Sequence, residues 1–387
     1  MRTLLALAVT AATVAPMACA EGGRTVDEAA ESINEADYLR KVAIISADSM
    51  MGRDTPSEGL EMTADWIASE FERYGLEPGG DDGTYIQRWP YPAYGQDWDA
   101  TTVTVEGGPA LTLGADLAYT GSPADGEFTG EVTLLTGAAP AGEDRRATFQ
   151  AIRDALQGAE FEGRHVVVLS PDASDLARFV QGAAAVFVVS DLDDEGWQAF
   201  VEDQRKDVDR TYGGAPEFDG SPEFAIRRDA AMALLESGGI AAPEADGAIR
   251  TRPLPGLSIT VNAAAGQVDD AQAPNVVGIL PGSDPALAGE YVVFSAHMDH
   301  VGVNPGRARQ DSVFDASGAF VRMETDSIFN GADDDASGTI AVVEVAEAFA
   351  MLAEPPRRSM VFLLVSGEEK GLLGRRYYSD NPTVPAE

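Results

Sequence analysis

The stretch EYVVFSAHMD, residues 290–299, decides the fold, because an apolar strand here ends abruptly in polar side chains. Two further apolar runs share this form, APNVVGILPG at residues 273–282 and RRSMVFLLVSGEE at residues 357–369. Between the runs at residues 290–299 and 357–369, the segment ASGTIAVVEVAEAFAML at residues 336–352 carries apolar side chains at helical spacing. Apolar strands that alternate with a helix predict an α/β fold, with a mixed, mostly parallel sheet flanked by helices.

Two helices are predicted nearer the N-terminus, ADYLRKVAIIS at residues 36–46 and EGLEMTADWIASEFERYGLEP at residues 58–78. Gly75 is expected to end the second helix. The second helix places four large apolar side chains on one face, which we expect in the core: Met62, Trp66, Ile67 and Phe71.

The middle of the sequence has a different texture, with short β-like runs such as TTVTV, HVVVLSP and AAAVFVVSD separated by Gly, Pro and Asp. This texture predicts an inserted β-rich domain, in which His165 is structural or faces solvent. The sequence therefore divides into four expected segments. They are a leader (1–20), the first part of the α/β domain (21–100), the inserted domain (101–256) and the rest of the α/β domain (257–387).

The chain of 387 residues is strongly acidic, with a formal net charge of −37 at pH 7. Such a surface repels nucleic acid and anionic membranes, so neither is expected as a partner. A hydrophobic content of 44% fits a soluble globular protein. No apolar run after the leader is long enough to predict a transmembrane span.

The N-terminus, MRTLLALAVTAATVAPMACAEGG, has a basic start, an apolar run and a small-residue cleavage site. This pattern predicts a secretory signal peptide and an exported protein, periplasmic or extracellular. Cys19 raises the alternative of a lipid anchor, but Pro16 occupies the position where a lipobox has an aliphatic residue. Cleavage after Ala20 is therefore favoured. Cys19 is the single cysteine of the sequence, so no intrachain disulfide forms.

Three predicted element edges carry metal-ligand residue types. His297 and Asp299 follow one strand, the run 333–335 (Asp-Asp-Asp) precedes a helix, and Glu368 with Glu369 follows another strand. Functional groups of α/β sheets gather at the carboxyl ends of strands, and imidazole and carboxylate are ligands that zinc accepts. Each pattern alone has an ordinary reading, such as helix capping or a solvated surface. Together they predict a metal site.

The residues also suggest a division of roles. Asp299 stands two residues after His297, where a carboxylate can orient a ligating imidazole. Asp335 lies near a helix N-terminus, where a carboxylate can cap the helix. Ala336 and Gly338 are small and allow close approach.

Three segments together resemble the secreted di-zinc aminopeptidase family: SAHMDHVGV (295–303), SIFNGADDDASGTIAVVEVA (327–346) and LLVSGEEKGLLGRRYY (363–378). Relatives of that family include aminopeptidase Y, bacterial leucyl aminopeptidase, glutamate carboxypeptidase, glutaminyl cyclase and the transferrin receptor. The segment 50–80 resembles the family's N-terminal region, and the inserted domain resembles its protease-associated domain.

The resemblance implies a metallo-aminopeptidase that hydrolyses peptides with two zinc ions. It implies that His297 binds one ion, that Asp334 bridges both, and that Glu369 binds the second. Glu368 would be the general base and Asp299 the residue that orients His297. Two metal ions about 3.5–4 Å apart activate water in such enzymes.

The sequence departs from the family at its C-terminal end. The family pattern needs a further aspartate and a further histidine well after the Glu-Glu pair, whereas no histidine follows Glu369 and Asp380 comes too soon. We therefore expect a fragment or a truncated product, with one protein ligand missing from each ion. His300 could replace a ligand, but its strand position points elsewhere from His297, so it is not placed in the set. The long segment 306–327 is expected to be a loop at the substrate entrance.

Two other functions stay open. A carboxypeptidase or a cyclase of the same family would keep the site and change the substrate. An inactive, truncated relative would serve as a binding protein.

Overall fold

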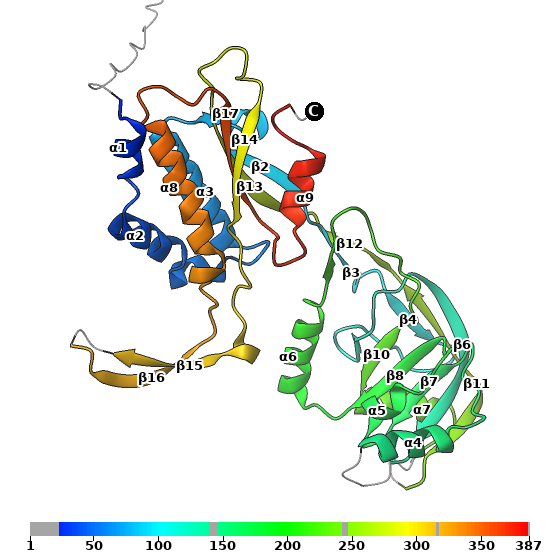
Figure 1. The fold of residues 1–387 in the computed structure, drawn as a ribbon. Helices are drawn as coiled ribbons and strands as arrows, with labels where there is room; N and C mark the ends of the chain where they lie inside the picture. The colour runs from blue at the N-terminus through cyan, green and yellow to red at the C-terminus, as the bar shows by residue number, and fades with distance from the viewer. Residues whose placement is uncertain (1–22, 139–144, 242–246, 315–316, 386–387) are drawn as a thin grey trace, which may run out of the picture. The chain divides into compact units, whose positions relative to one another are not determined.

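The computed structural model describes residues 23–138, 145–241, 247–314 and 317–385 (Figure 1). The predicted leader and Cys19 lie outside the described residues. The chain forms two compact units. One contains the segments up to Trp89 and from Gln272, and the other runs from Pro90 to Ala271.

The first unit is an α/β layer structure, as predicted. Its helices are α1 (Val26–Ala30), α2 (Glu35–Ile45), α3 (Glu58–Tyr74), α8 (Ser337–Ala350) and α9 (Leu373–Asp380). Its main sheet contains β1 (Glu77–Pro78), β2 (Ile86–Pro90), β13 (Gln272–Leu280), β14 (Tyr291–His297) and β17 (Ser359–Val365). None of the helices among the described residues combines the length and apolar character needed to cross a bilayer.

The main sheet is mixed. Its strand order is β1-β13-β17-β14, and β2 also pairs with β13. β14 runs parallel to β17, whereas β13 runs antiparallel to both β17 and β1. The sheet is mixed, as predicted, but these pairs are not mostly parallel: one is parallel and two are antiparallel. An apolar run does not encode the direction of a strand.

Helix α3 ends at Gly75, as predicted, and a side chain caps its first turn. The Ser57 hydroxyl accepts a hydrogen bond from the Leu60 N–H, and Gly75 ends the helix with a left-handed φ of 77°. Ile67 and Phe71 are fully buried, as predicted. Met62 is 41% exposed, so its predicted place in the core was wrong. The helix buries Leu60 and Ala64 instead, which shifts the apolar face round the helix.

Helices cover both faces of this sheet (Figure 1). On one face, α3 and α8 pack against the strands, and Phe71 and Val343 join Phe362 in one apolar cluster. On the other face, Tyr378 of α9 packs with Val361. Two layers of helices therefore fix the ends of β14 and β17, which carry the polar motifs.

The segment 306–327, expected to be a loop, forms a two-stranded antiparallel hairpin, β15 (Arg309–Phe314) and β16 (Phe320–Asp326). Its side chains are largely exposed, and Phe320 keeps 57% of its surface accessible. The described side chains of these strands form no buried apolar face, so hydrophobic patterning did not predict the strands.

The second unit is built on a seven-stranded sheet of order β4-β11-β6-β7-β8-β10-β5. These strands are β4 (Thr102–Val105), β5 (Leu117–Tyr119), β6 (Gly126–Thr136), β7 (His165–Leu169), β8 (Ala185–Ser190), β10 (Glu223–Arg227) and β11 (Arg250–Ala263). Its helices are α4 (Arg145–Ala155), α5 (Ala173–Ala177), α6 (Asp194–Gln204) and α7 (Arg228–Ser237).

A small sheet of β3 (Ala93–Gln96), β9 (Asp209–Arg210) and β12 (Ala265–Asp269) also belongs to this second unit. Because β3 and β12 pair with each other, the unit extends beyond the segment 101–256 drawn from composition. His165 is fully buried, and its Nε2 lies 2.9 Å from the Ile259 carbonyl oxygen, which is the structural role expected.

Candidate metal centre

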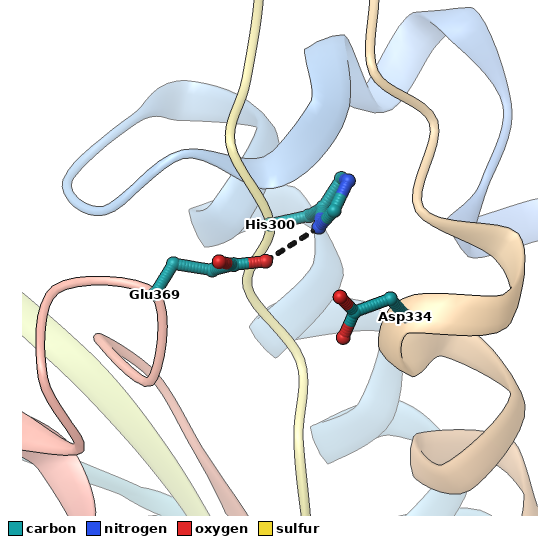
Figure 2. A group of neighbouring side chains, drawn as sticks. All are labelled: His300, Asp334 and Glu369. Atoms are coloured by element: carbon teal, nitrogen blue, oxygen red, sulfur yellow. Dashed lines mark hydrogen bonds and ion pairs between the residues drawn. The ribbon is translucent and has the colours of Figure 1, made fainter.

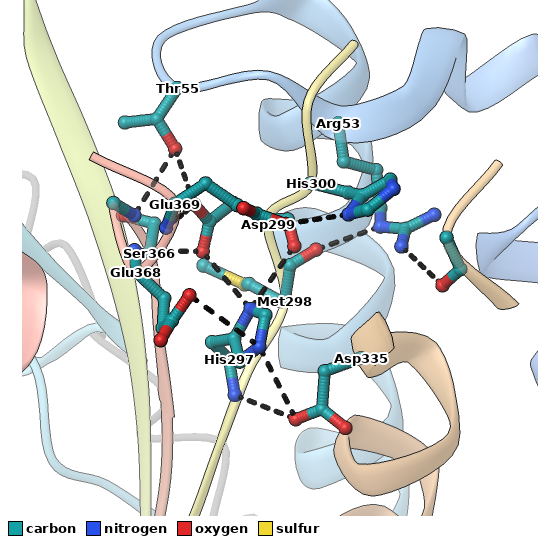
Figure 3. Close-up of polar contacts among 12 residues, drawn as sticks. Arg53, Thr55, His297, Met298, Asp299, His300, Asp335, Ser366, Glu368 and Glu369 are labelled. Atoms are coloured by element: carbon teal, nitrogen blue, oxygen red, sulfur yellow. Dashed lines mark hydrogen bonds and ion pairs between the residues drawn. The ribbon is translucent and has the colours of Figure 1, made fainter. Parts of the chain in front are cut away.

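The register of two strands brings two of the polar motifs together. β14 and β17 are parallel neighbours, and His297, the last residue of β14, pairs with Val365, the last residue of β17. The residues that follow both strands therefore leave the sheet at the same edge. Glu368 and Glu369 come immediately after this point, beside the residues that follow His297 (Figure 3).

Asp299 is fully buried and ties the two motifs together. Its Oδ1 accepts a hydrogen bond from the Glu368 N–H at 3.2 Å, and its Oδ2 accepts one from the Glu369 N–H at 3.4 Å. The Thr55 hydroxyl donates to Oδ2 at 3.2 Å and accepts from the Gly367 N–H at 3.1 Å. The carboxylate thus fixes the backbone that carries both glutamates.

Asp299 also lies next to the ring of His297, with 3.6 Å between Asp299 Oδ1 and His297 Nδ1. Burial opposes protonation of His297, but the Asp299 contact and the charges of Asp299, Asp335 and Glu368 outweigh it and raise its pKa to about 9. A ring held in such a negative environment attracts cations, whether protons or metal ions. The His297 Nδ1 lies nearer the Asp299 carbonyl oxygen, at 3.2 Å, than the carboxylate, so the carboxylate acts on the ring through its charge.

The aspartate run divides its work between the ring and the backbone. Asp334 Oδ1 lies 3.3 Å from His297 Nε2, on the exposed side of the centre. Asp335 Oδ2 accepts from the His297 N–H at 3.2 Å, and its Oδ1 accepts from the Gly338 N–H at 3.0 Å. Asp335 therefore caps the first turn of α8, as predicted, and anchors β14 to that helix. Asp334 is left to face the centre.

The two glutamates face different histidines (Figure 3). Glu368 Oε2 lies 3.9 Å from His297 Nε2. Glu369 Oε1 lies 2.7 Å from Nδ1 of His300. His300 was expected to point elsewhere from His297, but β14 ends at His297, so the strand alternation on which that expectation rested does not reach His300.

The side chains of His300, Asp334 and Glu369 form a group able to hold a metal ion (Figure 2). One ligand atom from each lies within 4.8 Å of the others. Imidazole nitrogen and carboxylate oxygen together suit zinc. His297 lies beside the same Asp334, so the centre offers an imidazole on either side of that carboxylate.

A second acidic group, formed by Asp37, Glu344 and Glu347, already contains a cationic side chain. The buried ammonium of Lys41 contacts Glu344 and lies 2.6 Å from Glu347 Oε2 and 3.0 Å from Asp37 Oδ2. Burial alone would lower the pKa of Lys41, but the three carboxylates have the larger effect and raise it, so the residue stays charged. This group is a structural ion pair between α2 and α8.

Sequence reasoning missed Arg53. Its fully buried guanidinium donates through Nε to the Met298 carbonyl at 2.8 Å, and through Nη1 to those of Ile45 at 2.8 Å and Asn330 at 2.6 Å. Its Nη2 donates to the Gly331 carbonyl at 2.8 Å. Arg53 thus joins the segment after β14 to the segment before the aspartate run. The resemblance of residues 50–80 to the family was the available signal, but it gave no role to Arg53 or Thr55.

The segment that contains these motifs also matches a known protein family. Residues 275–386 match the model of Peptidase family M28. A vacuolar membrane protease of Pyricularia oryzae is 32% identical over 97 residues, which cover 24% of this chain and 10% of that protein. A vacuolar membrane protease of Verticillium alfalfae is 31% identical over 72 residues, covering 18% of this chain and 7% of that protein. The matches therefore span about a tenth or less of these relatives.

Among solved structures, a zinc aminopeptidase from Bacillus subtilis, BSAP, aligns with a TM-score of 0.37 and 16% sequence identity. The alignment covers 89% of this chain and 64% of that chain.

Proposed function

Residues 275–386 carry a domain of Peptidase family M28, and from this premise we propose that the chain forms an exported zinc-dependent aminopeptidase. One observation carries the proposal: two carboxylates converge on the ring of His297. Asp334 Oδ1 lies 3.3 Å and Glu368 Oε2 lies 3.9 Å from the His297 Nε2. They come from three separate motifs, and a structural ion pair alone would not require all three at one sheet edge.

The imidazole and carboxylate donors suit zinc, and we propose that they hold two ions. His297 would hold one ion and Glu369 the other. Asp334 would be shared by both, since its Oδ1 lies 3.3 Å from the His297 Nε2 and its carboxylate points toward His300 and Glu369 (Figure 2). Bound zinc would supply Lewis acidity, which makes water a nucleophile near neutral pH and polarises a peptide carbonyl. The buried Asp299 would hold the His297 ring and the Glu368 backbone in place.

Glu368 is proposed as the general base. Its Oε2 lies 3.9 Å from the His297 Nε2, and its backbone N–H is fixed by the Asp299 carboxylate. In this role Glu368 accepts a proton from the attacking water and then donates it to the leaving amine. A positioned acid–base of this kind contributes about 10²–10⁴-fold to rate.

The second unit is proposed as a protease-associated-type domain inserted into the peptidase domain. Export also rests on the leader pattern. Peptides are the proposed substrates, and the free α-amine would restrict cleavage to the first peptide bond. A carboxypeptidase or a cyclase of the same family remains the alternative that keeps these residues and changes the substrate.

The test compares leucine p-nitroanilide with its N-acetylated form as substrates of the purified full chain. An aminopeptidase cleaves the free amine and refuses the acetylated compound, and Glu368→Ala abolishes cleavage while bound zinc is retained. Cleavage of both compounds at equal rates would contradict aminopeptidase specificity. Full activity of E368A would remove Glu368 from the mechanism.

A further inference from the structure

His300 is held in one position by its surroundings. Its backbone N–H donates to the Arg53 carbonyl at 3.1 Å. Its ring lies against Gly331, where an added Cβ would stand 2.6 Å from the His300 Cγ. Gly331 also has a left-handed φ of 55°. The glycine thus leaves the space that the ring occupies, and the ring is fixed rather than loose on the surface.

The fixed ring presents Nδ1 to Glu369. The distance from Nδ1 to Glu369 Oε1 is 2.7 Å, and Asp334 completes a group whose ligand atoms lie within 4.8 Å of one another. His300 and Glu369 are both half-buried, with side-chain exposures of 15% and 20%. One imidazole and two carboxylates are ligand types that zinc accepts.

The other two histidines of the sequence are engaged elsewhere. His297 faces Asp334 and Glu368, and His165 is buried in the second unit against Ile259. His300 is therefore the histidine that this chain places beside Glu369.

We propose that Nδ1 of His300 is a ligand of the cation held by Glu369, with Asp334 shared between this cation and the one on His297. The proposal rests on the proposed function, since it concerns the same centre. Binding requires the neutral ring, so any proton on Nδ1 leaves to solvent as the cation enters.

The experiment titrates zinc into the metal-free full chain by calorimetry and counts imidazole ligands by zinc X-ray absorption. His300→Ala removes the ring. His300→Gln keeps an amide donor for Glu369 but is a poor zinc ligand. Lys370→Ala is the matched control, because Lys370 follows Glu369 directly yet pairs with Asp54 at 2.8 Å.

We expect the native chain and K370A to bind two zinc ions. H300A and H300Q should bind the first ion normally and the second more than about 100-fold more weakly, beyond the 10–100-fold typical of residues behind a ligand. The mean number of imidazoles per zinc should fall from about one to about half when both sites are filled. Circular dichroism of the metal-free variants tests whether they are folded. If H300A does not fold, H300Q provides the test.

Two outcomes would overturn the proposal. If H300Q binds both ions with native affinity, or if its imidazole count is unchanged, His300 only forms a hydrogen bond with Glu369 and the proposed function stands. If the native chain binds no zinc, the proposed function and the His300 ligand fail together. The two failures are distinguished by the native titration alone.

Discussion

The buried Asp299 carboxylate accepts a hydrogen bond from the backbone N–H of Glu368 at 3.2 Å. This contact joins the end of β14 to the turn after β17, so the proposed metal-orienting residue also positions the proposed base. One side chain thereby couples ligand geometry to the placement of the base. Substitutions at Asp299 should therefore affect both zinc binding and stability.

Asp299→Asn tests this coupling. The new amide would set an N–H₂ group against the N–H donors of Glu368 or Glu369, so one donor loses its acceptor. We expect a loss of about 1–3 kcal/mol in the free energy of unfolding and a 10–100-fold fall in zinc affinity. Urea unfolding and zinc calorimetry measure these effects. Asp54→Asn, at a part-exposed carboxylate, is the control, and equal behaviour of the two variants would contradict the coupling.

Arg53→Lys tests the link between the two ligand segments. An ammonium cannot reproduce the planar set of hydrogen bonds from Arg53 to the carbonyls of Met298, Ile45, Asn330 and Gly331. We expect a loss of roughly 3 kcal/mol in the free energy of unfolding, because buried carbonyls lose their donors.

The control for Arg53 is Arg40→Lys, since Arg40 is 57% exposed on α2 and pairs with Asp37. This change should shift the free energy of unfolding by less than about 0.5 kcal/mol. A stability of R53K equal to that of R40K would show that the four carbonyl contacts are dispensable.

His165 should make the second unit acid-sensitive. Burial lowers the pKa of His165 to about 4, against the opposing hydrogen bond to Ile259. The unfolded chain binds the proton below about pH 6.5, whereas the folded chain stays neutral down to about pH 4. Stability is therefore full above pH 6.5 and falls by at most about 3 kcal/mol as the pH drops to 4.

Hydrogen exchange of the β7 amides, measured between pH 4 and 7 and corrected for intrinsic exchange, reports this loss. His165→Gln keeps a side-chain amide for Ile259 and removes the titration, so its opening free energy should change less over the same range. Parallel pH profiles of the two proteins would assign the acid sensitivity to other groups.

Helices and strands were predicted well where single residues or short apolar runs specify them. Gly75 marked the end of α3, and the apolar runs marked β13, β14 and β17. The directions of the strands were not encoded in those runs, so the antiparallel placement of β13 emerged only from the fold. Met62 lies at the margin of an apolar face, where the choice between core and solvent depends on which helix packs opposite.

The centre shows the same limit. The order of His297, Asp334 and Glu368 pointed to one site because strand ends collect functional groups. Arg53 and Thr55 act through contacts with residues more than two hundred positions away, which no local pattern specifies. The direction of His300 depends on the irregular backbone that follows β14, which strand alternation does not describe.

The most direct measurement follows zinc content and hydrolysis of leucine p-nitroanilide in one metal-stripped sample of the full chain as zinc is added. We expect the native rate to rise with bound zinc. Glu368→Gln should bind the same zinc but hydrolyse about 10²–10⁴-fold more slowly. Native hydrolysis at full rate without a divalent ion would contradict a zinc-dependent mechanism, and a native rate for E368Q at full zinc content would contradict Glu368 as the general base.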